Sequence, residues 1–311
     1  GEGTDTLSLD AASAVVLDAD TAFASKLDSF ERLAITGATG TQSIDVEKLG
    51  FADYVTLKGS AGTTTLSNFV NNGTLVVDAA VTTAVVATVK DDATGTTDVL
   101  NVELTNENSI TVAELEVDKI ETVNLTVTDV FTDNGAGKDT NDATHTMDFK
   151  SSEATTLNID GTAGLTLTLD AATTKLATID ASGMTEGALT VAANGSVAMT
   201  ITGGAGADVL TASSGTNAKA DVIVGGAGAD TIVAGTNGAT LTGGSGNDLF
   251  ILTASSATTG TKESNTYSTI TDFSAGDRLV LETYNTGGTA TATVTSFSKL
   301  AASLNESTAT F

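Results

Sequence analysis

The chain of 311 residues contains no cysteine, no proline and no tryptophan, one histidine, and only 4% aromatic residues. Without cysteine, neither disulfides nor thiolate metal sites are available. The zinc protease motif needs two histidines and the common hydrolytic triads need a histidine beside a nucleophile, and His145 is the sole candidate. A carboxylate-only glycosidase stays open, although the lack of tryptophan for sugar stacking argues against it. We therefore expect no enzyme.

Positive charge is also scarce. The 13 basic residues face 39 acidic ones, which gives a formal charge of −26. Nucleic acid and anionic lipid are therefore not expected partners, because both need clusters of lysine and arginine. No run of 18 apolar residues occurs, so no membrane span is expected. The acidic residues fit either a soluble, self-repelling surface or sites for hard cations.

Short runs rich in Thr, Val, Leu and Ile alternate apolar and polar residues and are punctuated by Gly, Asn and Asp, which predicts strands. These runs cover residues 33–36, 54–58, 75–77, 123–127, 165–169 and 189–191. One short helix is expected near residues 20–30, where Phe23 and Leu27 are spaced i, i+4 and Asp20 can cap the start. Residues 111–121 fit helix or strand, and their context favours strand. The fold class is mainly β.

Internal repeats begin near residue 155. Ile159, Ile179 and Ile201 head similar segments at intervals of 20 and 22 residues. Such intervals match one rung of a parallel β-solenoid, in which each rung covers the apolar face of the previous one. We expect a β-rich, potentially solenoid region over 1–150, and over 151–311 a β-solenoid with a β-roll at about 194–251 and a closing C-terminal hairpin. The boundary is placed near the polar, unpatterned residues 130–142.

Three segments match the pattern Gly-Gly-x-Gly-x-Asp-x-apolar-x at every defined position: residues 203–211 (GGAGADVLT), 225–233 (GGAGADTIV) and 243–251 (GGSGNDLFI). Glycine permits a tight turn with bare carbonyls and aspartate adds an anionic oxygen, which together suit the six to eight oxygen ligands of Ca²⁺. A turn array without metal is the alternative. It would stack Asp208, Asp230 and Asp248 as like charges with nothing to neutralise them.

The spacing leaves room for degenerate half-turns at 194–202, 216–224 and 234–242, which alternate with the complete motifs. All complete motifs should therefore lie on one edge of a roll with two strands per turn. Met199, Asp221 and Ala239 should lie on the opposite edge, where Asp221 is the one candidate for a weak metal site. The expected core is a ladder of apolar residues: Ile201, Leu210, Ile223, Ile232, Leu241 and Phe250.

These nonapeptides resemble the RTX calcium-binding repeats of proteins exported by bacterial type I secretion. The resemblance implies that each ion lies between two stacked turns and takes backbone carbonyls and an aspartate from both. The implied ligands of the first ion are Gly204, Gly206, Asp208, Gly225, Ala227 and Asp230. The implied ligands of the second are Gly226, Gly228, Asp230, Gly243, Ser245 and Asp248.

Residues 270–279 (ITDFSAGDRL) resemble the hairpin that closes such rolls, where an Asp-Phe pair commonly completes the last site. Asp272 is the preferred further ligand and Asp277 the weaker one, and Gly244 and Gly246 belong to the expected ligand set. Asp272 and Asp277 could equally be turn-forming aspartates.

Residues 1–9 (GEGTDTLSL) fit a trailing partial repeat. The Leu- and Asp-rich stretch that follows them, together with residues 30–33 (FERL), resembles segments of RTX-type surface-layer proteins of Gram-negative bacteria. This resemblance implies a structural protein on the bacterial cell surface, exported unfolded and folded outside by calcium, which then assembles with copies of itself. Cell-surface polysaccharide is a further expected partner, through regions outside these residues. The alternatives are a secreted adhesin or ligand-binding module, or the RTX tail of an enzyme. An ice-binding module is disfavoured because no regular Thr-x-Thr ladder is visible.

Overall fold

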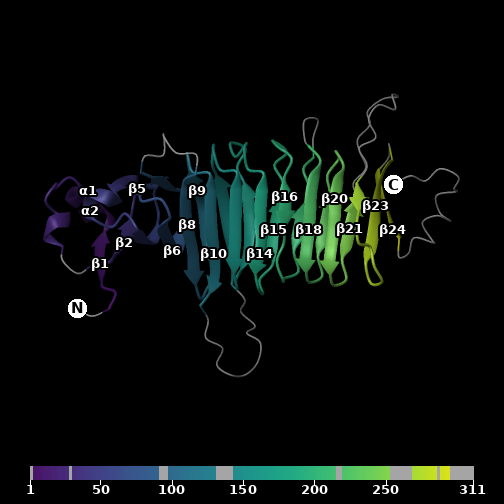
Figure 1. Ribbon diagram of the computed structural model, residues 1–311, viewed down its shortest axis with the longest axis horizontal. Coiled ribbons are helices and arrows are strands. Elements are labelled where there is room, and N and C mark those ends of the chain that lie inside the picture. Colours follow the sequence, from purple (N-terminus) through teal and green to yellow (C-terminus); the bar gives the residue numbers. More distant parts are fainter. Residues whose placement is uncertain are drawn as a thin grey trace, which may run out of the picture. The chain divides into compact units, whose positions relative to one another are not determined.

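The computed structural model describes residues 3–27, 30–90, 97–130, 143–214, 219–252, 268–285 and 288–294. These residues form two compact units, Gly1–Leu176 and Ala177–Phe311. Both are built from parallel strands with very little helix (Figure 1). The expected class, a mainly β parallel solenoid, is confirmed. No helix among the described residues is long and apolar enough to cross a membrane.

In the first unit the chain alternates between two columns of parallel strands, so that each turn adds one strand to each column. The first column contains β1 (Thr6–Asp10), β2 (Arg32–Ala38), β4 (Tyr54–Ser60), β6 (Gly73–Val81), β8 (Val99–Asn106), β10 (Thr122–Asp129) and β12 (Thr156–Gly161). The second contains β3 (Gln42–Asp45), β5 (Thr64–Phe69), β7 (Val85–Val89), β9 (Thr111–Val117), β11 (Thr144–Lys150) and β13 (Gly164–Leu169). Residues 111–117 are therefore strand, as their context favoured.

The register brings one inward residue of each turn onto the next. Leu33 lies beside Val55, Val55 beside Leu75, and Leu75 beside Val102. These side chains are fully buried. The alternation of the sequence thus places one face of every strand in a continuous apolar core between the two columns.

The expected helix at 20–30 is corrected by the structure. The helix α1 covers Ala11–Asp18, and within 20–27 only a 3₁₀ turn, Ala24–Lys26, is formed. Asp10 rather than Asp20 provides the cap, since its carboxylate accepts hydrogen bonds from the backbone N–H and the hydroxyl of Ser13. The i, i+4 spacing of Phe23 and Leu27 misled the prediction because both side chains lie outside the core.

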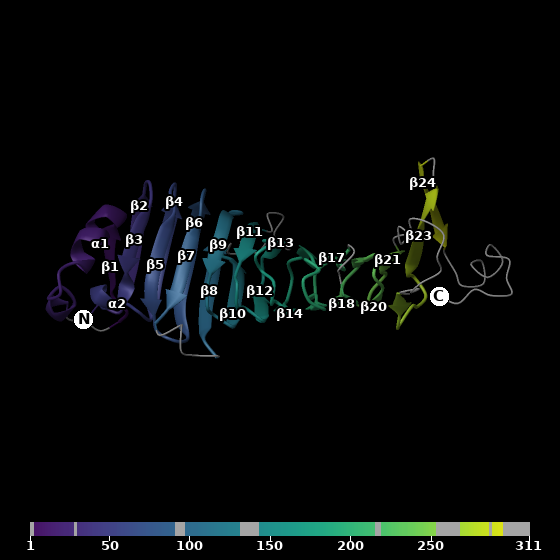
Figure 2. The same ribbon diagram turned by 90° about the horizontal axis from the view of Figure 1, so that it is seen from above.

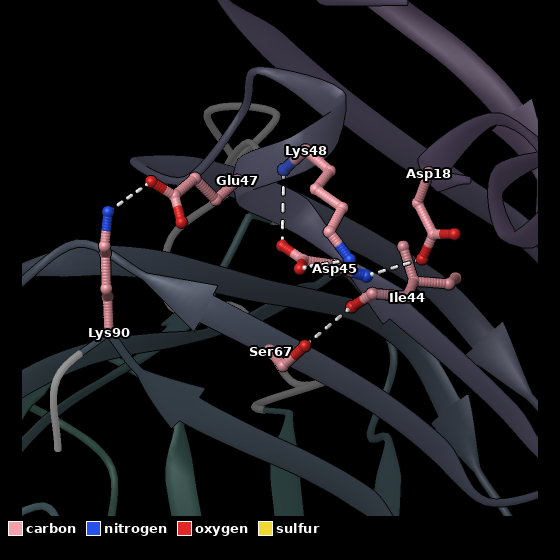
Figure 3. Close-up of polar contacts among 7 residues, drawn as sticks. All are labelled: Asp18, Ile44, Asp45, Glu47, Lys48, Ser67 and Lys90. Carbon is pink, nitrogen blue, oxygen red and sulfur yellow. Dashed lines mark hydrogen bonds and ion pairs between the residues drawn. The ribbon is translucent and has the colours of Figure 1, made fainter. Parts of the chain in front are cut away.

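A second short helix, α2 (Val46–Leu49), follows β3 directly and lies near α1 (Figures 2 and 3). Asp45 caps it by accepting from the backbone N–H of Lys48, while its own N–H donates to Asp18 at the end of α1. The side chain of Lys90 binds Glu47 of α2 (Figure 3). These polar contacts attach both helices to the first turns of the coil.

The second unit repeats the two-column plan. Its first column contains β14 (Thr178–Met184), β16 (Thr200–Thr202), β18 (Asp221–Ala227), β20 (Ala239–Ser245) and β22 (Thr269–Ile270). Its second contains β15 (Leu189–Ala192), β17 (Val209–Thr211), β19 (Thr231–Ala234), β21 (Leu249–Leu252) and β23 (Arg278–Asn285). The antiparallel strand β24 (Gly288–Val294) pairs with β23.

The predicted core ladder of the second unit is confirmed. Every member is fully buried, and the six residues divide between the two columns. Ile201 pairs with Ile223 and Ile223 with Leu241 in one column, while Leu210, Ile232 and Phe250 follow one another in the other.

Part of the first column carries two rows of uncharged side chains on its outward side. Outward residues of β16, β18, β20 and β22 lie in register as two rows of threonine and valine. The rows were not visible in the sequence because equivalent residues such as Ile201, Ile223 and Leu241 are separated by unequal intervals. Valines replace both threonines in β18, so a regular Thr-x-Thr ladder is not formed over these successive turns, as expected.

Candidate metal centre

The three complete nonapeptides lie on one edge of the second unit. Each forms the turn that leads from the first column to the second: β16 to β17, β18 to β19, and β20 to β21. The stacking is in register, because Gly226 pairs with Gly244 and Ala227 with Ser245. The prediction that the complete motifs share one edge is confirmed by this topology.

The glycines are required by backbone angle and by crowding. Gly228 and Gly246 have φ of 122° and 141°, a conformation that side chains rarely adopt. A Cβ on Gly228 would lie 2.2 Å from the carbonyl oxygen of Gly206, and one on Gly246 would clash with the carbonyl oxygen of Gly228. Successive turns thus pack backbone on backbone, which leaves their carbonyl oxygens uncovered by side chains.

The aspartates form a ladder along this edge. The backbone N–H of Asp208 donates to Asp230 at 2.8 Å, that of Asp230 to Asp248 at 3.0 Å, and that of Asp248 to Asp277 at 2.9 Å. In each pair the Oδ1 atom accepts. All four side chains are buried, so the ladder places carboxylates one turn apart in a region from which water is excluded.

The second carboxylate oxygens point to where neighbouring carbonyls converge. A Cβ placed on Gly203 would lie 2.1 Å from Asp208 Oδ2 and 2.2 Å from the carbonyl oxygen of Gly225. A Cβ placed on Gly225 would lie 2.3 Å from Asp230 Oδ2 and 2.4 Å from the carbonyl oxygen of Gly243. Each of these oxygen pairs belongs to one of the two implied ligand sets, and hard oxygens of this kind are what Ca²⁺ prefers.

Asp230 is the least satisfied group of the ladder. Its Oδ2 is buried and has no hydrogen-bond partner. Burial raises the pKa of Asp230 to about 7; the hydrogen bond from Asp208 opposes this rise, and the charges of Asp208 and Asp248 add to it. Burial also raises the pKa of Asp208 and of Asp248. A bound cation would offset the cost of burying these charges, because it favours the charged form of each carboxylate.

The remaining carbonyls of the implied sets lie in the same three turns. The carbonyl of Gly204 accepts from the N–H of Ala227, and that of Ser245 accepts from the N–H of Gly228, both at 2.8 Å. A carbonyl oxygen has two lone pairs, so these bonds leave one acceptor site on each oxygen. The described residues contain no group of three or more acidic or histidine side chains arranged for a metal. A calcium shell here therefore depends on backbone carbonyls, which the residue pattern fits.

The sequence made Asp272 the preferred further ligand of the closing segment and Asp277 the weaker one, but in the structure it is Asp277 that extends the ladder. Asp277 continues the ladder, and its Oδ2 accepts from the backbone N–H of Ser274. Asp272 instead accepts from the N–H groups of Gly243 and Gly244, at 2.9 and 2.7 Å. Both contact the last complete turn, to which Gly246 also belongs, and both remain candidate ligands.

Asp221, the candidate for a weak metal site, lies on the opposite edge of the second unit. Asp221 is buried, and its two oxygens accept from the backbone N–H groups of Met199 and Ser213 at 2.8 and 2.7 Å. Met199 and Ala239, the other residues predicted for this edge, are also buried. Through these two hydrogen bonds Asp221 holds the backbones of neighbouring half-turns together.

Sequence reasoning missed the turn that precedes the first complete motif. The backbone N–H of Leu189 donates to Asp208 Oδ1 at 2.6 Å, so Leu189 occupies the position of the ladder aspartate one turn earlier. The N–H of Ala205 binds the carbonyl of Met184 in that same turn. No Gly-Gly or Asp marks these residues, so the sequence offered no signal, and the carboxylate ladder starts at Asp208.

A single histidine between polar residues is most often found on the surface, but His145 is not. It lies within β11, is fully buried, and accepts a hydrogen bond from the backbone N–H of Ile110 through Nδ1 at 3.2 Å. His145 therefore has a structural role, because its side chain faces the core of the first unit.

A comparison with protein-family models matches residues 200–218 and 216–250 to the RTX calcium-binding nonapeptide repeat, in four copies. The matched residues are the turns and strands of the candidate centre. Ca²⁺ is therefore the ion that these repeats bind, and the match supports an RTX protein, a class that is typically secreted and extracellular. A search of curated proteins finds no match to the chain.

Proposed function

We propose that this chain is a structural protein of a bacterial surface layer, in which calcium sets the fold of the second unit and promotes assembly with other copies. The observation that carries the proposal is the buried carboxylate ladder, with Asp230 Oδ2 lacking any hydrogen-bond partner. Such a group favours a state in which a cation is bound, so folding and calcium binding are coupled.

The proposed order of events follows from this coupling. Where free calcium is scarce, clustered acids repel and glycine-rich turns carry a large conformational entropy cost, which keeps the repeats unfolded and competent for type I secretion. Outside the cell, calcium at roughly millimolar concentration matches extracellular sites with dissociation constants of about 10⁻⁴ to 10⁻³ M. The repeats then fold as they bind.

A structural rather than catalytic role is part of the proposal. The sequence contains one histidine and no cysteine, and that histidine is buried in the first unit. Each unit presents on its described surface the outward faces of a repeating coil.

The test is a calcium titration of the purified chain, followed by circular dichroism and by electron microscopy on the same sample. We expect β structure to increase with calcium and regular sheets to form once it is bound. Folding without assembly would contradict the surface-layer proposal and favour an adhesin or an enzyme tail. An identical fold and melting temperature in excess chelator would contradict the calcium coupling itself.

A further inference from the structure

Two outward faces of the second unit carry no charge, although the chain as a whole has a formal charge of −26. The threonine face consists of outward residues in and next to β16, β18, β20 and β22: Thr200, Thr202, Val222, Val224, Thr240, Thr242, Thr269 and Thr271. The aliphatic face consists of outward residues of β17, β19 and β21: Val209, Thr211, Thr231, Val233, Leu249 and Ile251. The faces point away from the core in opposite directions, because inward and outward residues alternate along each strand.

We propose that the threonine face of one copy docks on the aliphatic face of the next. This inference rests on the proposed function, since it names the contact through which copies assemble. Copies with a large charge of one sign repel one another wherever acids face each other. Uncharged faces are where two copies can approach without burying unpaired charge.

The side chains of both faces suit such a contact. Every residue of the threonine face is β-branched, so its χ1 angle is already restricted and little entropy is lost on docking. The Oγ1 atoms of Thr242 and Thr271 lie 2.7 Å apart and hydrogen-bond to each other, which satisfies these two hydroxyls within the face and leaves their methyl groups to pack. Both faces expose apolar surface, since Val209 is 38% exposed and Val222 is 39% exposed. Two flat sheet faces of this kind can pack about 10 Å apart.

A contact between unlike faces also has the right symmetry for open growth. A face that binds its own equivalent closes a dimer, whereas a head-to-tail contact leaves one free face at each end and can repeat. A repeating contact of this kind builds a row of copies, which is one of the two directions in which a layer must grow. Asp180 in β14 lies beside Thr202, and Arg278 in β23 lies beside Leu249, so charged residues mark one end of each face.

The test uses three matched variants of the full chain in calcium. Val222→Glu changes the threonine face and Val209→Glu the aliphatic face, at residues with 39% and 38% exposure. Val16→Glu in α1, where the side chain is 72% exposed, is the control. Circular dichroism and calcium titration first confirm that all three fold and bind the ion as the parent does.

Sedimentation velocity then measures self-association. We expect each face variant to weaken it at least about tenfold, because docking would bury a carboxylate without a partner, and the control to leave it unchanged. A 1:1 mixture of the two face variants should form a heterodimer, because each variant brings the one intact face that the other lacks. Growth should stop there, because only the two altered faces are left exposed.

Association of either face variant at the parental level, or a mixture in which both variants stay apart, would overturn the docking of unlike faces. If the parent assembles normally while the variants do too, the surface-layer proposal survives and only this contact is lost. If the parent folds in calcium and never assembles, the proposed function fails first.

Discussion

The ladder aspartates differ in how many hydrogen bonds their two carboxylate oxygens accept. Oδ1 of Asp230 and of Asp248 accepts the N–H of the previous ladder residue, which fixes the height of one turn above the next. The Oδ2 of Asp208 also accepts an N–H, from Gly204 at 2.7 Å, whereas that of Asp230 accepts none. Asp230 belongs to both implied ligand sets and is the ladder residue that depends most on a cation.

Replacing Asp230 by asparagine should therefore weaken calcium binding more than any other single change on this edge. Asparagine keeps the Oδ1 acceptor and removes the charge shared by two ions, so we expect at least about a tenfold loss of affinity, since ligand charge tunes calcium affinity. Isothermal titration calorimetry measures it. Asp221→Asn, at the equivalent buried position of the other edge, is the matched control and should leave affinity unchanged. Equal losses in both variants would contradict the assignment of the edge.

His145 gives the first unit a pH dependence of its own. Nδ1 accepts a backbone hydrogen bond and Nε2 is buried without a hydrogen-bond partner, so the ring is held neutral. Burial lowers the pKa of His145 from its ordinary value of 6.5, against smaller opposing effects from the Thr128 backbone and the charge of Asp129. Below about pH 6.5 the unfolded chain takes up a proton that the folded unit resists, so stability falls as pH falls.

We expect His145→Gln to remove this slope, since glutamine can still accept from the N–H of Ile110 but does not titrate. Chemical denaturation between pH 7.5 and 5 measures it, with an effect of up to about 1.4 kcal/mol for each pH unit below the unfolded pKa. A slope of equal size in parent and variant would show that another group is responsible.

At the level of turns and strands, regular spacing decided what could be predicted. The second unit has complete motifs whose Asp residues are 22 and 18 positions apart, and its edge and core follow from that pattern. Asp277 lies 29 positions beyond Asp248 and has no Gly-Gly before it, so its place in the ladder could not be recognised. In the first unit the interval between paired core residues varies, from 20 residues between Val55 and Leu75 to 34 between Leu125 and Ile159. Such irregular intervals give no repeat that the sequence alone could show.

The close stacking of turns predicts a steep cost for any side chain at their glycines. In Gly228→Ala, the new Cβ combines an unfavourable φ of 122° with contact at 2.2 Å from the backbone of Gly206. Backbone strain alone costs about 1–3 kcal/mol, and we expect calcium-bound stability to fall by more. Gly37→Ala is the control, since φ there is 66° and nothing lies within 4 Å. Thermal unfolding in calcium compares them, and similar losses would show that crowding between turns contributes little.

Across the whole molecule, buried charge is unequally shared between the two units. Of the acidic residues buried in the described part of the chain, Asp98 belongs to the first unit, while Asp208, Asp221, Asp230, Asp248 and Asp277 belong to the second. The first unit has a continuous apolar core and no complete calcium motif. Its fold therefore follows from burial of apolar surface, whereas that of the second also needs its carboxylates neutralised.

Removal of calcium should thus affect the units differently. Calcium at about 100 times its dissociation constant stabilises the fold by about 2.7 kcal/mol, so its removal should speed exchange of protected amides by about 100-fold in β16–β21. Amides in β4–β10 should keep their protection. Hydrogen exchange in excess chelator, read by mass spectrometry of peptides, resolves the two regions. Loss of protection at the same rate in both would mean that the whole coil unfolds as one cooperative body, and that calcium stabilises the first unit as strongly as the turns that bind it.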